Sequence, residues 1–434
     1  MKRVALLALL LTAGTARAGS VAPPKLESWQ LPNGLRVAHI QVDRAPVVAV
    51  QMWYRVGSAV EPAGKHGLAK LVEILMTRGS AHVRPGDHER FIAEVGGVAR
   101  ASTLEDATGF HDLVPAGYLD LAVRLEADRM RGLEWRQSEL DTVRKTLGVQ
   151  LPQLTGDPTK QAVWRLDELL YGSHGYAHEP LGDKLDLDAI KLADLKKFYD
   201  TYYVPNNALL VVVGAVTRAQ VTAAADKYLA PIARAADPPA VTPPADKPTA
   251  QRRTLEPGPI GLIFHGWRIP EARHKDIYAL QMASLVLGIG HGSRLVGELV
   301  DTRRVAMDAG CSAVLHAQPG TFVVFASFEE PALAKDIETA LAGQVAELAR
   351  TPVTDAELER ARNQMRSELV PRLETATGLA NQAGLSWALT GDAGMYLRDV
   401  ASLEAVTAAD IQKAAATWLN SNTRVTVVIP PGAQ

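Results

Sequence analysis

The feature that most constrains the fold is an internal repeat, because the 434-residue chain repeats one segment at a distance of half its length. Residues 185–214 read LDLDAIKLADLKKFYDTYYVPNNALLVVVG, and residues 401–430 read ASLEAVTAADIQKAAATWLNSNTRVTVVIP. The segments align without a gap at an offset of 216 residues. Matched positions include Ala193 and Ala409, Asp194 and Asp410, Lys197 and Lys413, Thr201 and Thr417, and Asn206 and Asn422. Each copy predicts a capped helix, an Asn-containing turn and a β-branched strand, so we expect two homologous halves.

A proline-rich stretch separates the two copies. Residues 233–253 read ARAADPPAVTPPADKPTAQRR, in which five prolines favour extended chain over a helix or a central strand. We therefore predict a linker at residues 234–253, an N-half at 24–233 and a C-half at 254–434. Each half is long enough for its own hydrophobic core, so we expect the N-half to fold alone.

Strand and helix patterns mix within each half without strict alternation. In the N-half, the β-rich runs LRVAHIQV and VVAVQMWYRVG precede GLAKLVEILMTRGS, whose apolar residues recur at helical spacing up to Gly79. The stretch VARASTLEDATGFHDLVP then alternates as paired strands do. The pattern predicts an α+β fold in which each half is an antiparallel sheet with helices packed on one face.

The first residues have the pattern of an export signal. The basic start MKR precedes an apolar run at residues 4–11, and ARA at residues 16–18 offers a cleavage site. We predict a signal peptide at 1–18, cleavage near Ala18 and a periplasmic or secreted product. The run is shorter than the ~20 apolar residues of a membrane span, so no integral membrane segment is expected after signal removal. A formal net charge of −2 argues against a nucleic-acid partner, and the single Cys311 rules out an intramolecular disulfide framework.

Several segments resemble the pitrilysin/insulinase-type metallopeptidases, the inverted zincins with an H-x-x-E-H helix. They are VGSAVEPAGKHGLAKLVEILMTRGS, GGVARASTLEDATGFHDLVP, YGSHGYAHEPLG, FYDTYYVPNNALLVVVGAV and, in the C-half, GSRLVGELVDTRRVAMDAG. They span nearly the whole mature chain in the family's order. The resemblance implies that each half is an α+β domain and that the halves form a clam shell around an extended peptide.

The resemblance places the family's zinc ligands at positions that have changed. Its two His ligands fall at Lys70 and Ile74, and its Glu ligand falls at Val149 or Gln150. Only Glu73, at the general-base position, is kept. A catalytic zinc needs about three protein ligands, whereas a Lys ammonium offers only donors and Ile offers no ligand atom. We therefore expect no zinc and no other cofactor, and an i,i+3 ion pair between Lys70 and Glu73.

The segment ASTLEDAT at residues 101–108 resembles the family's edge strand, which binds extended peptides through main-chain groups. Strand addition of this kind tolerates side-chain change. The expected contact residues are Ala101, Ser102, Thr103 and Leu104. The alternative is that the chain's own loop covers this edge. The family's substrate-holding Arg and Tyr fall at Val300 and Met307, which leaves nearby Arg294 as a substrate-binding candidate or a plain helix-surface residue.

These observations predict a catalytically inactive subunit that helps a zinc-peptidase partner to hold extended peptides. The partner would be a homologous catalytic subunit or a second copy of this chain. One alternative is a stand-alone peptide-binding or chaperone-like module. Another is an active metalloendopeptidase with displaced ligands, such as His66 or His111 beside Glu73. His174 and His178 lie four residues apart in a Gly-containing segment, where we expect a loop rather than a metal-binding pair.

Overall fold

The computed structural model describes residues 24–244 and 248–432, and two mixed sheets organise them. The first sheet has six strands in the order β1-β2-β6-β3-β5-β4. They are β1 (Leu26–Gln30), β2 (Arg36–Gln41), β3 (Val47–Tyr54), β4 (Val98–Thr103), β5 (Thr108–Pro115) and β6 (Ala208–Gly214). Strand β4 therefore lies at one edge. The predicted signal peptide at 1–18 lies outside the described residues.

The second sheet has five strands in the order β7-β11-β8-β10-β9. They are β7 (Gln251–Thr254), β8 (Gly261–Ile269), β9 (Asp308–Val314), β10 (Gly320–Phe328) and β11 (Val425–Ile429). Apart from β1, the order is that of the first sheet, with β2, β6, β3, β5 and β4 equivalent to β7, β11, β8, β10 and β9. The repeated sequence segments contain β6 and β11, at equivalent positions. The prediction of two homologous halves is confirmed.

Each sheet contains one parallel pair, which the sequence patterns did not predict. Strand β2 runs parallel to β6, with Arg36 opposite Leu209, and β7 runs parallel to β11, with Gln251 opposite Val425. The other pairs are antiparallel. The parallel pairs arise because the strand of each repeated segment, β6 or β11, is the last strand of its half. It lies beside an early strand, β2 or β7, that runs in the same direction.

Most helices of each half pack around their own sheet. In the N-half they are α1 (Leu68–Arg78), α2 (Asp87–Glu94), α3 (Leu119–Arg131), α4 (Gln137–Thr155), α6 (Lys184–Ala189), α7 (Leu192–Tyr202) and α8 (Arg218–Tyr228). In the C-half they are α9 (Ile277–Gly288), α10 (Ala334–Arg350), α11 (Asp355–Arg372), α13 (Met395–Glu404) and α14 (Ala408–Trp418), with a π-helical turn at Val296–Thr302. Each half has its own large buried apolar cluster.

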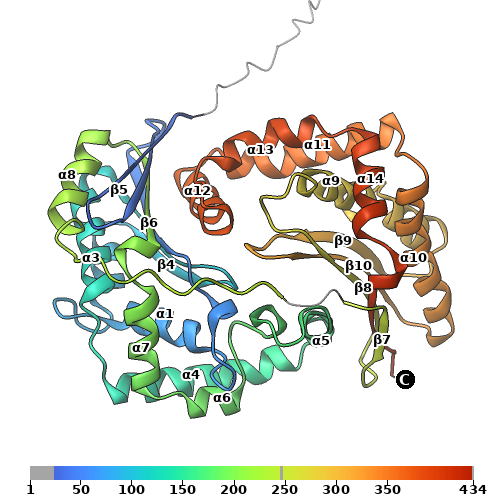
Figure 1. Ribbon diagram of the computed structural model, residues 1–434, viewed down its shortest axis with the longest axis horizontal. Helices are drawn as coiled ribbons and strands as arrows, with labels where there is room; N and C mark the ends of the chain where they lie inside the picture. Colours follow the sequence, from blue (N-terminus) through green and yellow to red (C-terminus); the bar gives the residue numbers. More distant parts are fainter. Residues whose placement is uncertain (1–23, 245–247, 433–434) are drawn as a thin grey trace, which may run out of the picture.

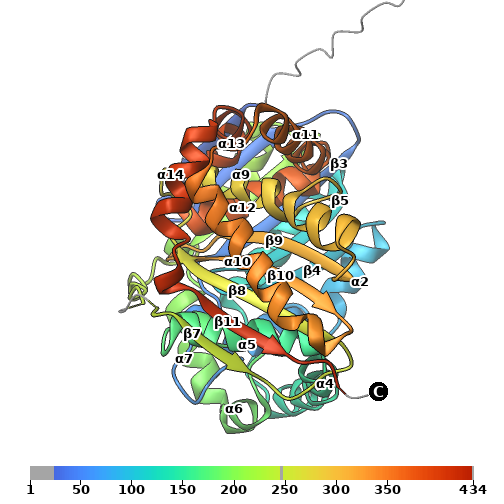
Figure 2. The same ribbon diagram turned by 90° about the vertical axis from the view of Figure 1, so that its right-hand side faces the viewer.

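The opposite face of each sheet is covered by one helix from the other half. Helix α12 (Ala376–Thr390) of the C-half packs on β3 and β6, where Trp387 joins Trp53 in one apolar cluster. Helix α5 (Pro158–Tyr171) of the N-half packs on β8 and β11, where Leu166 joins Phe264. Figure 1 shows α12 between the halves, and Figure 2 shows α5 beside β11. The sequence patterns predicted helices on one face of each sheet, but they did not predict this additional cover from the other half.

The connection between α8 and β7 is extended, as its prolines predict. Residues 233–244 and 248–250 have no regular secondary structure. The Asn206 side chain donates to Asp237 Oδ1 at 2.8 Å and fastens the start of the connection to the N-half. Strand β7 begins at Gln251, so the irregular stretch ends before the predicted boundary at Arg253. In the part of the chain described, no helix has the length and apolar character needed to cross a membrane.

Candidate functional site

Helix α1 is bounded by two glycines and held at its first turn by a buried acid. Gly67 has φ +93° and Gly79 has φ +145°, values that favour glycine. The Glu61 carboxylate accepts hydrogen bonds from the backbone N–H of Gly67 at 2.8 Å and of Ala69 at 2.6 Å. These bonds satisfy amides that a helix start otherwise leaves unpaired. Burial raises the pKa of Glu61 to about 8, although the two amide bonds oppose the rise.

Glu73 lies in the middle of α1 and is only 4% exposed. Its Oε2 accepts hydrogen bonds from Lys70 Nζ and from Thr103 Oγ1, each at 2.6 Å. The predicted ion pair between Lys70 and Glu73 is therefore present. The bond from Thr103 was not predicted, because the sequence pattern does not show which side chain of β4 faces α1. Through Glu73, the helix is tied to the last residue of the edge strand.

The residues at the implied metal positions do not fit a zinc ion. The Lys70 ammonium already supplies a positive charge to Glu73, and it has no lone pair to offer a metal. Ile74 packs against the N-half core, and its side chain contains no ligand atom. On α4, Val149 is 66% exposed and Gln150 is also exposed. One carboxylate beside an ammonium is not a ligand set for a divalent cation.

Strand β4 has a free edge. It pairs only with β5, with Ala101 opposite Phe110 and Ser102 opposite Gly109. Within the described residues, no main-chain hydrogen bond joins 98–103 to any segment other than β5. Backbone groups at such an edge can pair with an additional extended strand.

Leu104 differs from the other three predicted contact residues, because β4 ends at Thr103. The Leu104 N–H donates to the Ala107 carbonyl at 2.8 Å, and its carbonyl accepts from Ser58 N–H at 3.2 Å. Both main-chain groups are thus used within the N-half. Its side chain, 36% exposed, remains available for contact.

The turn after β4 also connects the two halves. Asp106 accepts hydrogen bonds from the Tyr176 hydroxyl in the N-half and from Ala317 N–H in the C-half, the latter at 2.9 Å. His316 Nδ1 lies 3.5 Å from Asp106 Oδ2. Burial alone would lower the pKa of His316, but the hydrogen bond and charge of Asp106 raise it overall. The end of the free edge is therefore fixed against the C-half.

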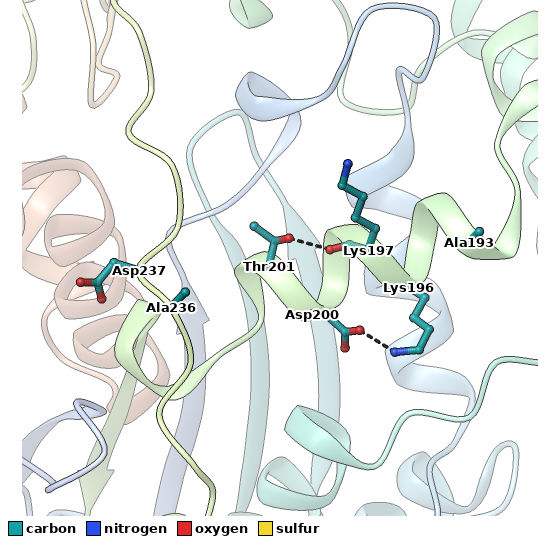
Figure 3. Close-up of a pocket in the computed structure, with 7 residues that line it drawn as sticks. All are labelled: Ala193, Lys196, Lys197, Asp200, Thr201, Ala236 and Asp237. Atoms are coloured by element: carbon teal, nitrogen blue, oxygen red, sulfur yellow. Dashed lines mark hydrogen bonds and ion pairs between the residues drawn. The ribbon is translucent and has the colours of Figure 1, made fainter.

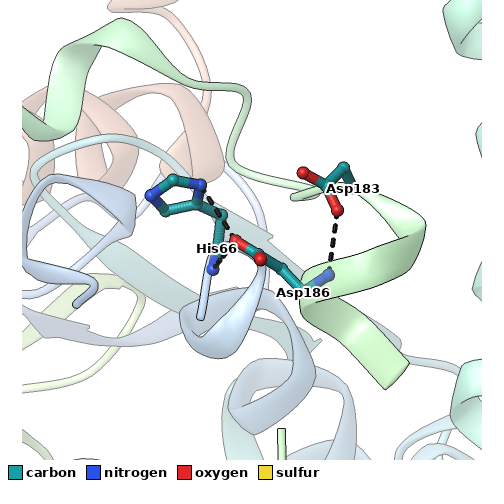
Figure 4. Close-up of side chains that lie close together, drawn as sticks. All are labelled: His66, Asp183 and Asp186. Atoms are coloured by element: carbon teal, nitrogen blue, oxygen red, sulfur yellow. Dashed lines mark hydrogen bonds and ion pairs between the residues drawn. The ribbon is translucent and has the colours of Figure 1, made fainter. Parts of the chain in front are cut away.

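His66 belongs to a separate cluster rather than to the surroundings of Glu73. Its Nδ1 lies 3.0 Å from Asp186 Oδ2, and its ring stacks on His178 with centroids 3.8 Å apart. Asp183 caps α6 by accepting from Asp186 N–H at 2.9 Å. Figure 4 shows the side chains of His66, Asp183 and Asp186 gathered around one space, and one ligand atom of each lies within 4.8 Å of the others. His66 is more than a hundred positions away from Asp183 and Asp186, so sequence spacing gave no sign of the cluster.

The other histidines proposed as ligands also have separate partners. His111 Nε2 lies 3.0 Å from Ser102 Oγ, and burial lowers the pKa of His111 to about 4. His174 accepts from Tyr176 N–H, whereas His178 Nδ1 lies 3.8 Å from a Glu61 oxygen. Their segment is a loop with a short 3-10 turn at Gly175–Ala177, as predicted. The hydrogen bonds and ion pairs of His66 and His111 thus involve groups other than Glu73.

A second buried cluster joins α2, β5 and α3. Arg129 donates to His88 Nδ1 at 2.6 Å, and His88 Nε2 lies 3.3 Å from Asp112. Glu126 is fully buried, and neither of its oxygens has a hydrogen-bond partner among the residues that the structure describes, although Oε1 lies 3.5 Å from Arg129. Burial raises the pKa of Glu126 to about 8, against the charge of Arg129 and with that of Asp112. Arg129 supplies the cation here, so the cluster has no need of a metal.

In the C-half, Arg294 is held by an acid of its own domain. Its Nε and Nη2 donate to the Glu357 carboxylate at 2.6 and 3.1 Å. The hydrogen bond from Arg294 lowers the pKa of Glu357 to about 2. A role for Arg294 in substrate binding remains a prediction.

A surface cavity of about 530 Å³ lies between α7 and the linker. Figure 3 shows Lys196 paired with Asp200 and the Thr201 hydroxyl bonded to the Lys197 carbonyl along α7, while Asp237 belongs to the linker. These bonds follow the helix and do not point into a common site. None of the lining residues belongs to α1 or β4.

Comparison with known families accounts for both halves. A family model described as "Insulinase (Peptidase family M16)" matches residues 36–174, and one described as "Peptidase M16 inactive domain" matches residues 189–365. Together they cover most of the chain. The chain belongs to the insulinase family, peptidase family M16. Helix α1 and β4 lie in the part matched by the insulinase model, whereas the inactive-domain model covers mainly the C-half.

Several known proteins are similar to this chain along nearly its whole length. "Zinc protease PqqE" of Helicobacter pylori is 27% identical over 86% of this chain and 85% of its own. A probable mitochondrial-processing peptidase subunit beta of Arabidopsis thaliana is 22% identical over 91% of this chain and 76% of its own. A crystal structure of a protease from Helicobacter pylori has a TM-score of 0.88 at 25% identity, covering 94% of this chain and 100% of that one. The peptidase M16 inactive domain of Pseudomonas fluorescens has a TM-score of 0.87 at 19% identity, covering 94% and 99%.

Proposed function

We propose that this M16 protein is a non-catalytic, exported subunit that holds extended peptides for an active zinc-peptidase partner. The observation that carries the proposal is the state of Glu73. The Lys70 ammonium, 2.6 Å away, provides the cation beside that carboxylate, and Thr103 provides a second donor. With Ile74 and either Val149 or Gln150 at the remaining ligand positions, the carboxylate has no metal-polarised water to activate.

The free edge of β4 supports the peptide-holding part of the proposal. Main-chain pairing does not depend on the lost ligands, so an inactive member can keep this surface. Thr103 and Asp106 fix the end of the strand through α1 and through the C-half. A rigid edge lowers the entropy cost of pairing with a flexible peptide.

The partner part of the proposal rests on the relatives. One relative is named as a subunit of a processing peptidase, and one similar chain comes from a structure of Complex III2 of Candida albicans. Assembly with other chains thus occurs in this family. For this protein, the proposed partner is a homologue that keeps an intact H-x-x-E-H helix, with a self-dimer as the other candidate.

Peptide binding by β4 can be tested with a pair of proline substitutions. N–H groups alternate in direction along a strand, so of Ala101→Pro and Ser102→Pro one removes an outward N–H and the other an N–H facing β5. Loss of the N–H that faces β5 should lower the melting temperature, because it removes a hydrogen bond of the sheet. The variant that keeps the melting temperature of the parent is therefore the one that lacks the outward N–H. It should lose at least tenfold in affinity for a labelled unstructured peptide. Unchanged affinity in that variant would refute binding at this edge.

The subunit role can be tested by mixing. Addition of the purified chain to an M16 homologue from the same host that has intact zinc ligands should give a complex of defined mass and raise its peptide cleavage. A strictly monomeric chain with no effect on cleavage would contradict this role. In that case the stand-alone peptide-binding alternative would be favoured, because one chain already contains both halves.

A further inference from the structure

A cavity of about 410 Å³ opens where the free edge of β4 ends. Leu104, the residue that follows β4, is the part of its lining that comes from the N-half. The rest comes from the C-half, chiefly from α9, α12 and α13 and from the end of β9. The cavity therefore lies between the halves, and it borders the residue that follows the edge strand.

Apolar residues outnumber polar ones in the lining, which also includes Gln281, Arg372, Gln382 and Thr390. Its aliphatic residues include Leu104, Ile277, Leu315, Leu385, Leu389 and Leu403. A volume of 410 Å³ falls in the range of roughly 300–1,000 Å³ typical of ligand pockets, and an apolar lining gains free energy when it is shielded from water. This space suits a large hydrophobic side chain.

A few polar groups stand among the apolar ones. The Tyr278 hydroxyl donates to Asp399 Oδ1 at 2.8 Å, and both residues line the cavity. Tyr396 also lines it and is 4% exposed, yet its hydroxyl has no hydrogen-bond partner in the described chain. Buried polar groups are usually paired, and the Tyr396 hydroxyl can form a hydrogen bond with a main-chain group of a peptide that enters the cavity.

We propose that this cavity binds one bulky apolar side chain, aromatic or leucine-like, of the peptide that pairs with β4. The inference rests on the proposed function and adds a sequence preference to it. Main-chain pairing at β4 is indifferent to sequence, because every residue offers the same backbone groups. The cavity past Leu104 would then select peptides with a large hydrophobic residue just beyond the paired segment.

The test uses the full chain and two labelled peptides. Both have the same Ser/Thr/Gly sequence, and they differ only in one central residue, Phe or Ala. Fluorescence anisotropy should show about tenfold tighter binding of the Phe peptide. In Ser386→Trp, which places an indole in the cavity wall on α12, the two affinities should become equal. The matched control is Ser138→Trp, on the exposed surface of α4, which should keep the preference.

The outcomes separate the cavity from the edge strand. Equal affinities in the unaltered chain, or a preference that survives Ser386→Trp, would overturn the cavity proposal. If the cavity proposal fails in this way but the outward proline variant of β4 loses affinity for both peptides, peptide binding at the edge strand remains supported. If the unaltered chain binds neither peptide, both proposals fall. A lipid found by mass spectrometry in the purified chain and displaced by Ser386→Trp would also overturn the peptide assignment.

Discussion

At the scale of single residues, the chemistry of α1 depends on what surrounds Glu73. A nearly buried carboxylate needs partners, and this one has an ammonium and a hydroxyl. The same side chain that would serve as a general base beside a metal here links α1 to β4. Lys70 is therefore expected to contribute to the stability of the fold.

Replacement of Lys70 should reveal this contribution. In Lys70→Met, the Glu73 carboxylate keeps only the bond from Thr103, so stability should fall by about 1–3 kcal/mol. In the double variant Lys70→Met/Glu73→Gln, part of the lost stability should be recovered, because the buried side chain at position 73 is now neutral. Thermal unfolding measures both. If the single variant melts like the parent, the ion pair is not part of what holds the helix to the strand.

Glu126 should make stability depend on pH. Its pKa is about 8 in the folded chain against a reference of 4.5, so between these values the folded state binds a proton that the unfolded chain has released. The contribution of protonated Glu126 to the free energy of unfolding is therefore fully present below pH 4.5 and is lost as the pH rises through 8. Glu126→Gln removes this pH dependence, so the stability of the variant relative to the parent should rise with pH across the window, by at most about 1.4 kcal/mol per pH unit. A stability difference that stays constant from pH 5 to pH 8 would contradict the assignment.

At the scale of elements, the contact of α12 with β3 leaves no room for a side chain at Gly384. A Cβ there would lie 2.0 Å from Trp53 Nε1. Two side-chain hydrogen bonds extend the contact, from Trp53 Nε1 to Gln51 at 2.9 Å and from Gln51 Nε2 to Asn381 of α12 at 2.8 Å. The glycine lets a helix of the C-half approach the sheet of the N-half closely.

Gly384→Ala should therefore push α12 away from β3 and destabilise the protein by about 1–3 kcal/mol. Gly343→Ala is the matched control, since Gly343 is exposed in α10 and a Cβ there meets no atom within 4 Å. That change should stabilise the protein slightly through helix propensity, by about 0.5–1 kcal/mol. Equal melting temperatures for the two variants would show that the approach of α12 is looser than described.

The elements themselves were largely predictable, whereas their partners were not. Alternation gave β4 and β5, and the periodicity ending at Gly79 gave α1. The register of the repeat placed β6 and β11 at equivalent positions. The patterns of α5 and α12 show which residues are apolar but not which sheet they meet. For the same reason the contact of Thr103 with Glu73 and the cluster of His66, Asp186 and His178 appeared only in three dimensions.

At the scale of the whole molecule, the exchange of α5 and α12 changes the expected independence of the halves. Without the C-half, residues such as Trp53 and Val211 would lose the cover of α12. A fragment of residues 24–233 should therefore expose an apolar sheet face and associate or aggregate. This replaces the sequence-based expectation that the N-half folds alone. A monomeric, cooperatively unfolding fragment, measured by ultracentrifugation and calorimetry, would restore that expectation.

Cleavage of the linker should have a different effect from removal of a half. We expect limited proteolysis to cut first within residues 235–249, where the described residues have no regular structure. The two fragments should still elute as one particle in size-exclusion chromatography, because α5 and α12 keep their contacts across the halves. Separation of the fragments without denaturant would show that those contacts are weak.

The central claim is that Glu73 does not hold a catalytic zinc, and zinc content tests it most simply. The purified full chain and Glu73→Gln are each dialysed against zinc, and their zinc contents are measured by mass spectrometry. A parallel assay follows peptide cleavage with and without a chelator. We expect no zinc that depends on Glu73 and no chelator-sensitive cleavage. Zinc lost only in Asp186→Asn would instead belong to the cluster around His66. One zinc per chain that Glu73→Gln removes, together with cleavage that the chelator abolishes, would contradict the account.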